Sequence, residues 1–177
     1  NQIDPNIKLK LNDVIIKLDP FNFKINAKTL GTDLSYKNKT IKVETIQSKI
    51  SIKSLIYNNF YLSEIFISTK PLIIRDLIIF ARLLNNNFEF DNAERLIKKG
   101  YLIADLKMEF DDNGKVKNNF KFNGFVKDGE INLFEKYEFN KIDFNFKIED
   151  KELKFNDLKI AYKNKNILVP ELTALKK

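Results

Sequence analysis

The chain has 177 residues and is 44% hydrophobic, which excludes a disordered chain and suffices for one good-sized domain or one segment of a longer array. It contains no cysteine, so disulfide bonds, thiol chemistry and zinc-thiolate sites are excluded, and no histidine, the commonest general base and metal ligand. The net charge is +7, but the lysines alternate with apolar residues and form no dense basic block. We therefore expect a solvated, basic outer face.

Residues 1–69 are predicted to form a first block of β-strands. Apolar residues alternate with polar ones from Ile7 onward, which is typical of strands with one buried face. The alternation repeatedly slips by one residue, for example where Leu11 is followed by Asn12, Asp13 and then Val14. Such a step keeps apolar residues on one face only if the strand has a bulge or turns a corner. Several such steps in register predict a bent sheet.

Residues 70–100 are predicted to be a helical interlude. The main helix is expected over about residues 71–84, because Pro71 suits the first helical position and most of the following residues are apolar. A helix of this kind must be covered on more than one side. It either packs, buried, on a sheet or caps a hydrophobic trough, and the capping residues would then be Leu72, Leu77, Phe80 and Leu84. Its internal charges and its length argue against a transmembrane helix.

A short second helix is expected over about residues 92–99. Asp91 or Asn92 is suited to cap its beginning, and Gly100 is suited to end it. Leu96 and Ile97 would then pack on the rest of the molecule.

Residues 101–177 are predicted to form a second β-block, with hairpin turns that make the sheet mainly antiparallel. The slipped alternation returns here, across Asn140-Lys141 and Asn156-Asp157. Since no linker rich in Pro, Gly or Ser divides the chain, residues 1–177 are interpreted as a single unit. The sequence starts at once in polar residues and strand pattern, which suggests a fragment or a processed form. The expected turns are Asp111-Asp112-Asn113-Gly114, Lys127-Asp128-Gly129, Asp150-Lys151 and Lys163-Asn164-Lys165-Asn166.

No group of residues indicates catalysis. Paired acids such as Asp111 and Asp112 lie in turn-like sequences, where Asp forms local hydrogen bonds. Phosphate-binding loops, nucleophile elbows and metal-ligand spacings are absent from the sequence, so we expect neither an enzyme nor a cofactor or metal site. Arginine occurs only at Arg75, Arg82 and Arg95, away from the aromatic strands, so we expect no nucleic-acid partner.

The abundant apolar residues on one strand face need a partner. Two such faces can cover each other in a closed β-sandwich, or one strongly curved open sheet can line an elongated apolar groove filled by a helix or by acyl chains. The slipped alternation favours the curved antiparallel sheet, and with it a mainly β fold. The residues expected to form the floor of the groove are Leu9, Leu11, Ile50, Ile52, Leu106, Met108, Phe120, Phe122, Phe144 and Phe146.

Several runs of the sequence resemble a known family. These are LSEIFISTKPLIIRDLIIFARLL, GYLIADLKMEFDDNGKVKNNFKFNGFVKDGEINL and the short repeats LNDVIIKL, FNKIDFNFKI and FNDLKIAY. A pair of hairpins also matches, at residues 110–116 and 124–131. Together these runs resemble the AsmA-like family, which includes the AsmA, YhdP and TamB type proteins of Gram-negative envelopes. The resemblance extends over about residues 7–170.

The resemblance implies a taco-shaped β-groove that crosses the periplasm and guides phospholipids from the inner towards the outer membrane. It also implies that residues 1–177 are an internal or C-terminal fragment of a longer chain. An N-terminal helix missing from this sequence would anchor that chain in the inner membrane, and its partners would include outer-membrane components. The alternative function is a structural or interaction β-sandwich domain of a surface or envelope protein.

Overall fold

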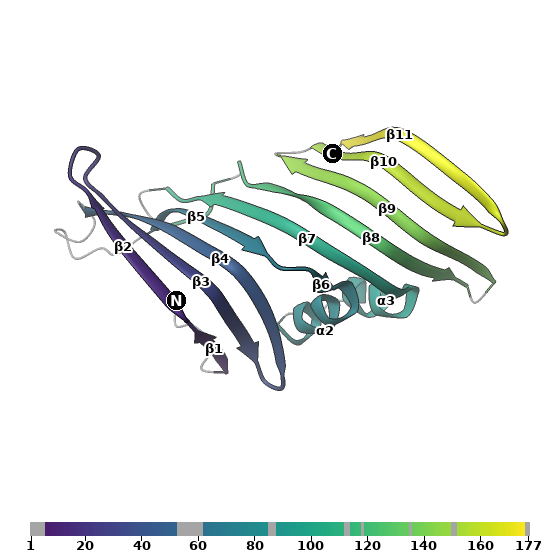
Figure 1. The fold of residues 1–177 in the computed structure, drawn as a ribbon, viewed down its shortest axis with the longest axis horizontal. Helices are drawn as coiled ribbons and strands as arrows, with labels where there is room; N and C mark the ends of the chain where they lie inside the picture. Colours follow the sequence, from purple (N-terminus) through teal and green to yellow (C-terminus); the bar gives the residue numbers. More distant parts are fainter. Residues whose placement is uncertain are drawn as a thin grey trace.

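The computed structural model describes residues 6–52, 62–84, 88–111, 114–117, 119–134, 136–149 and 152–175. These residues form one large antiparallel sheet of eleven strands and two helices (Figure 1). The sheet does not close on itself, so the described residues form an open sheet and not the two packed sheets of a β-sandwich. The expectation of a mainly β, antiparallel fold is confirmed.

The strands follow one another across the sheet almost in chain order. Nine of them are hydrogen-bonded in the order β1-β3-β4-β5-β7-β8-β9-β10-β11, while β2 pairs with β3 and β6 pairs with β7. Neighbours along the chain are mostly joined as hairpins, and every ladder between the described strands is antiparallel. The bounds are β1 Ile7–Lys10, β2 Asp13–Asp19, β3 Lys24–Tyr36, β4 Lys39–Ser51, β5 Leu62–Thr69, β6 Leu72–Ile73, β7 Ile97–Glu109, β8 Lys121–Leu133, β9 Tyr137–Glu149, β10 Glu152–Tyr162 and β11 Lys165–Leu175.

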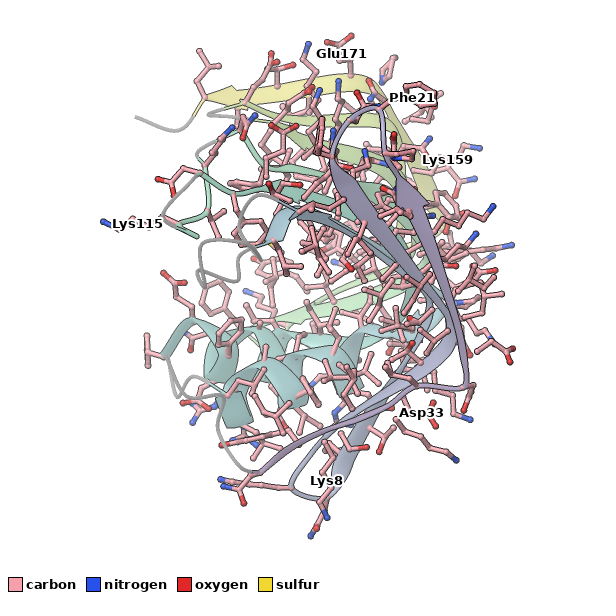
Figure 2. The ribbon with its side chains drawn as sticks, turned by 90° about the vertical axis from the view of Figure 1, so that its left-hand side faces the viewer. Lys8, Phe21, Asp33, Lys115, Lys159 and Glu171 are labelled. Atoms are coloured by element: carbon pink, nitrogen blue, oxygen red, sulfur yellow. The ribbon has the colours of Figure 1, made fainter. Side chains whose placement is uncertain are left out.

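Most long strands carry an irregularity near the middle. The ladders of β7 with β8, of β8 with β9 and of β9 with β10 all contain register shifts, and each of these strands has a residue with positive φ. A bulge adds a residue on one strand, which bends that strand and increases its twist. The sheet accordingly bows around the side on which the two helices lie (Figure 2). Within the described strands, the residues with positive φ are Gly31 in β3, Gly100 in β7, Asp128 in β8, Lys141 in β9 and Asp157 in β10.

The slipped alternation correctly predicts several of these irregularities. The shift between Asn156 and Lys159 lies at the predicted step in β10, and Lys141 in β9 lies at another. The step at Asn12-Asp13 instead separates two strands, β1 and β2, which pair with successive halves of β3. The bent sheet is therefore visible in the sequence as a change of phase in the apolar pattern.

One predicted turn is wrong. The segment Lys127-Asp128-Gly129 lies within β8 as a bulge, and not between two strands. Asp128 has φ 52, a conformation that Asp tolerates better than most residues, and its N–H donates a hydrogen bond to Asp143 Oδ1 of β9 at 2.7 Å. A turn and a bulge therefore favour the same residue types here. The segment is recognised as a bulge only because β8 pairs with β9 on both sides of it.

The other predicted turns have different outcomes. Lys163 and Asn164 both have positive φ and join β10 to β11, as a two-residue hairpin turn requires, whereas Lys165 and Asn166 already belong to β11. The N–H of Gly114 donates to the carbonyl oxygen of Asp111 at 3.0 Å, which closes the turn after β7. The predicted turn at residues 150–151 lies outside the described residues.

The main helix is shorter than predicted. α2 covers Ile74–Leu84, because Leu72 and Ile73 pair with Leu102 and Tyr101 of β7 as strand β6. The predicted capping residue Leu72 therefore lies in a strand, while Leu77 is half-buried, Phe80 is buried and Leu84 is exposed. α2 packs on β7, β4 and β3 and also contacts α3, so it is covered on more than one side, as predicted.

The second helix is displaced from its predicted position. α3 covers Phe88–Leu96 and not residues 92–99. The reason is that Ile97 and Lys99 pair with Ile131 and Glu130 of β8, so residues 97–99 belong to β7. Gly100 does not end the helix. It has φ 137 at the bend of β7, where glycine is favoured.

Two groups of buried side chains hold α2 on the sheet. In the first, Tyr36, Ile41 and Val43 of β3 and β4 surround Phe80 of α2. In the second, Leu102, Ala104, Val126 and Phe146 of β7, β8 and β9 pack with Ile74 and Leu77 of α2 among their neighbours. Both groups lie on the same side of the sheet, which we call the inner face; the opposite side is the outer face.

Candidate functional site

The ladder registers show which residues share the inner face. Leu106 stands opposite Ile67 on one side and Phe122 on the other, and Gly124 stands opposite Phe146. Phe146 in turn stands opposite Phe155, which stands opposite Leu172 of the last strand. Since paired residues in an antiparallel ladder point to the same side, apolar residues recur on the inner face from β5 to β11.

Seven of the ten predicted floor residues lie on strands and share the inner face. Leu9 stands opposite Leu34, in phase with Tyr36 of β3. Ile50 stands opposite Ile25 and is in phase with Ile46, which packs against the first buried group. The other five are Leu106, Met108, Phe122, Phe144 and Phe146, in β7, β8 and β9. Leu11, Ile52 and Phe120 lie outside the named strands, next to strand ends.

Four phenylalanines form a cluster on the inner face of the second block. The rings of Phe122 and Phe146 lie 5.0 Å apart, those of Phe144 and Phe155 5.4 Å apart, and those of Phe144 and Phe146 6.3 Å apart. These distances are typical of tilted and edge-on aromatic pairs, which add to the free energy of burial. We call Phe122, Phe144, Phe146 and Phe155 the phenylalanine cluster.

Two buried threonines on the inner face of β3 were missed in the sequence. The hydroxyl oxygens of Thr29 and Thr32 lie 2.8 Å apart and share a hydrogen bond. Thr32 is fully buried and stands opposite Val43, while Thr29 stands opposite Ile46. Their position at apolar steps of the alternation was the available signal, because a threonine at such a step must bury its hydroxyl.

The inner face is covered only in its middle part. α2 and α3 lie over the central strands, while the first and last strands have no helix over them (Figure 1). Apolar residues in phase with the inner face are therefore exposed at both ends of the sheet: Ile16 of β2 is 69% exposed and Leu172 of β11 is 49% exposed. The other such residues are Leu9, Val14, Leu18 and Ile167.

The outer face carries ion pairs. Glu64 binds Lys49 at 2.8 Å and Lys107 at 3.2 Å, across three neighbouring strands. Burial tends to raise the pKa of Glu64, but hydrogen bonds from Lys49 and Lys107 outweigh it, so this pKa lies below its ordinary value. Because these three residues alternate along their strands with inner-face residues, the charged and apolar layers lie on opposite sides of the sheet.

A second outer-face ion pair lies in the other half of the sheet. Glu149 pairs with Lys121 and with Lys147, and their hydrogen bonds lower the pKa of Glu149 to about 2. All three side chains alternate with members of the phenylalanine cluster or their neighbours. The basic outer surface expected from the sequence is thus partly neutralised by neighbouring carboxylates.

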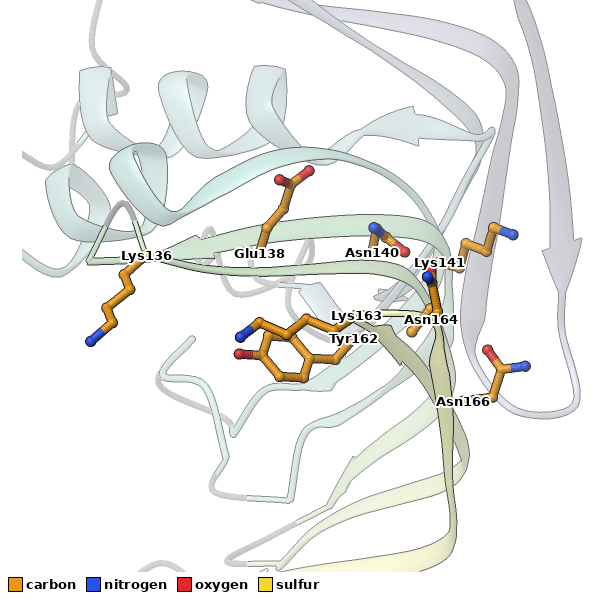
Figure 3. A pocket seen from close by; sticks show the side chains of 9 residues that line it. Lys136, Glu138, Asn140, Lys141, Tyr162, Lys163, Asn164 and Asn166 are labelled. Carbon is orange, nitrogen blue, oxygen red and sulfur yellow. The ribbon is translucent and has the colours of Figure 1, made fainter.

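A polar hollow of about 600 Å³ lies at the hairpin ends of β9, β10 and β11 (Figure 3). Its lining combines lysines with amide side chains and one carboxylate, that of Glu138. Lys163 lies over the Tyr162 ring at 5.3 Å, a cation–π distance, and Tyr162 stacks on Phe139 at 4.9 Å. We call the hairpin ends that line this hollow the rim, and its lysines are Lys136, Lys141 and Lys163.

An apolar pocket of about 210 Å³ lies beside the first turn of α2. Side chains of Ile74, Leu102 and Phe144 belong to its lining, so it adjoins both α2 and the phenylalanine cluster. The only ionisable residues of the lining are Lys99 and Glu130, which form an ion pair at 2.9 Å.

Two other kinds of feature are missing from the part of the chain that the structure describes. There, no group of three or more side chains is placed to hold a metal ion, and neither helix has the length and apolar character needed to cross a membrane. Comparison of the chain with protein-family models, with curated proteins and with solved structures found no match. The candidate site is the inner face, because its apolar residues are exposed near both ends of the sheet and an apolar pocket adjoins α2.

Proposed function

We propose that this chain is a lipid-binding segment of the AsmA-like type, in which acyl chains of phospholipids lie along an apolar groove formed by the inner face. The observation that supports this most strongly is the exposure of apolar inner-face residues beyond the helices. A sheet whose inner face serves only as a core would cover residues such as Ile16 and Leu172, whereas here they are 69% and 49% exposed.

The energetics of the proposed site follow from burial alone. Each methylene group of an acyl chain gains about 0.8 kcal/mol when it leaves water for an apolar surface, without requiring any directional bond. Phospholipid head groups would remain in water, and the rim lysines Lys136, Lys141 and Lys163 would attract their phosphates. The proposed role is binding and guiding of lipid, without catalysis.

The proposal also places the segment in a longer chain. As in the family it resembles, that chain would be anchored in the inner membrane, cross the periplasm and guide phospholipid towards partners in the outer membrane. The edge strands β2 and β11, which pair on one side only in the described residues, would continue the sheet at both ends.

The second candidate is a structural or interaction domain of a surface or envelope protein. The same edges favour it, because an edge strand offers unpaired N–H and C=O groups to a strand of a partner. In that case the exposed apolar residues would be covered by protein and not by lipid. The two candidates therefore differ in what a purified sample retains on this face.

The deciding experiment is native mass spectrometry with lipid extraction on the protein purified from a Gram-negative host. We expect co-purifying phospholipid, and we expect the variant with both Ile16→Asp and Leu172→Asp to retain several-fold less of it. These side chains are exposed, so the variant should still fold, which circular dichroism can verify. Ile15→Asp is the matched control, because Ile15 is the outer-face neighbour of Ile16 and is 43% exposed.

A folded protein without bound lipid, before and after incubation with phosphatidylethanolamine and phosphatidylglycerol vesicles, would contradict the proposal. In that outcome, self-association or partner binding that depends on β2 or β11 would favour the interaction domain. Equal lipid loss in Ile15→Asp would show that the inner face is not the lipid-binding side.

A further inference from the structure

The pocket beside α2 differs from the rest of the inner face because it is shaped on several sides. Its lining comes from the first residue of α2 and from β7, β8 and β9, whereas the exposed inner-face residues near the sheet ends lie on an uncovered sheet. An uncovered sheet allows a bound chain to slide, but a pocket fixes the position of whatever enters it. The apolar lining residues include Ile74, Leu102, Val126, Ile131, Ile142 and Phe144.

Two glycines at the bend of the sheet give the pocket its shape. A Cβ on Gly100 would come within 2.9 Å of Ile74 Cδ1, so the missing side chain lets α2 approach β7 closely. A Cβ on Gly129, which lines the pocket, would come within 3.0 Å of both Ile142 Cβ and the Ile142 carbonyl oxygen. The pocket thus exists where the bulged strands and the helix meet.

The chemistry of the lining restricts the occupant to hydrocarbon. Lys99 and Glu130 neutralise each other, and Lys99 is largely exposed, so neither charge is available to a ligand inside. An apolar cavity of about 150 Å³ holds a molecule of the size of benzene, so a volume of about 210 Å³ accommodates a short stretch of alkyl chain.

The surroundings of the pocket determine how an alkyl chain would reach it. Phe144 belongs both to the pocket and to the phenylalanine cluster, so the apolar surface is continuous from Phe155 to the pocket. Ile74 and Leu77 of α2 pack against the same core group and stand across the inner face at that point. A chain that lies on the cluster and extends towards the first block therefore meets α2.

We propose that this pocket binds the methyl end of one alkyl chain of a lipid, so that α2 acts as a stop on the inner face. This inference rests on the proposed function, because it requires lipid on that face. It adds a fixed terminal site to what would otherwise be a uniform track, and it gives a bound lipid a defined orientation, with its head group away from α2.

The test is photo-crosslinking with two palmitates, one carrying a diazirine at the methyl end and one carrying it next to the carboxylate. Peptide mapping of the labelled protein should place the methyl-end label on Ile74, Ile131 or Phe144 and the carboxylate-end label elsewhere. Competition with 1-palmitoyl-lysophosphatidylcholine and with unmodified palmitate identifies the source of the chain. Displacement by the lysophospholipid indicates a phospholipid, displacement by palmitate alone indicates a free fatty acid, and displacement by neither overturns the proposal.

Filling the pocket provides the second arm. Ile131→Phe should displace about two methylene groups of the bound chain and lower palmitate affinity about tenfold. Ile103→Phe makes the same change on the outer face, where Ile103 is 45% exposed, and should leave affinity unchanged. If Ile131→Phe fails to fold, the labelling pattern of the wild-type protein still decides.

The possible failures can be told apart. If neither palmitate binds or labels the protein, the proposed lipid-binding function itself fails. If both bind but the methyl-end label lies away from α2, and Ile131→Phe binds as tightly as the wild type, lipid binding stands and the terminal site is overturned.

Discussion

The two halves of the inner face can be compared strand by strand. Around β3 and β4 the layer combines aliphatic residues and the single ring of Tyr36 with the buried pair Thr29 and Thr32, and Phe80 of α2 packs edge-on against Tyr36. Around β8, β9 and β10 the sheet itself supplies the rings, in the phenylalanine cluster. The same bent sheet thus carries two kinds of inner surface.

The difference bears on what each half can do. A buried hydroxyl pair must keep its hydrogen bond, so the threonines fix their neighbours in one arrangement. Aromatic rings are held by non-directional packing and can contact an alkyl chain without losing a bond. The threonine pair therefore keeps the first half in one arrangement around Phe80, whereas the rings of the second half fit the contact with acyl chains that the proposed function requires.

The largest effect is expected from removing a ring of the phenylalanine cluster. Phe146 is buried and packs against Phe122 and Phe144, so Phe146→Ala should lower the free energy of unfolding by about 3–5 kcal/mol. Urea denaturation followed by circular dichroism measures this. Phe21→Ala is the control, because Phe21 is 94% exposed, and it should change stability by less than about 0.5 kcal/mol. Equal effects of the two substitutions would contradict the packing described for the second half.

A smaller loss is expected from Gly124→Ala, which tests how closely β7 and β9 approach β8. A Cβ on Gly124 would clash with the Ile103 carbonyl oxygen and lie 2.9 Å from Phe146 Cζ. Because the first of these atoms belongs to the backbone, the strand must shift, at a cost of about 1–3 kcal/mol. The same denaturation measurement applies, with the exposed neighbour Asn123→Ala as control. If Gly124→Ala left the free energy of unfolding unchanged, β7 and β9 would have room to move away from β8.

In the first half, the threonine pair is expected to behave as a unit. Thr32→Val alone leaves the Thr29 hydroxyl buried without its partner and should cost about 1–2 kcal/mol. The double variant Thr29→Val with Thr32→Val removes both hydroxyls and should recover part of that loss, which a double-mutant cycle measures. Strict additivity of the two single changes would mean that the shared hydrogen bond contributes nothing.

The sequence predicted the bend better than the ends of the elements. A bulge shifts the phase of the apolar alternation, so the steps at residues 140–141 and 156–157 are visible in the sequence and recur in the structure. The start of α2 was predicted three residues too early because the pairing of Leu72 with Leu102 depends on a strand thirty residues away. Local signals such as Pro71 carry no information about such a partner.

The candidate site was predictable only as a face. The alternation places Leu106, Phe122 and Phe146 on one side of the sheet, and the register agrees. The pocket beside α2 was not predictable, because it depends on how Ile74 of the helix meets Gly129 and Phe144 of separate strands. Such a meeting follows from the bend, and the bend angle is not encoded in any one segment.

The smallest effect concerns the outer face, where each half has one carboxylate held by two lysines. Hydrogen bonds from Lys121 and Lys147 lower the pKa of Glu149 from 4.5 to about 2. Because the folded pKa lies below the unfolded one, the contribution of Glu149 to stability is present above pH 4.5 and is lost as the pH falls towards 2. The stability advantage of the wild type over Glu149→Gln should therefore shrink from about pH 6 to about pH 2.

Glu64 in the first half provides the comparison for that experiment. Its pKa is also lowered, but it is more buried than Glu149, and desolvation opposes the hydrogen bonds from Lys49 and Lys107. NMR titration of the side-chain carboxyl carbons should therefore show Glu149 ionising at the lower pH of the two. The reverse order, or an ordinary pKa for Glu149, would mean that the lysines of the second half are mobile in solution and that its outer face is held less firmly than that of the first half.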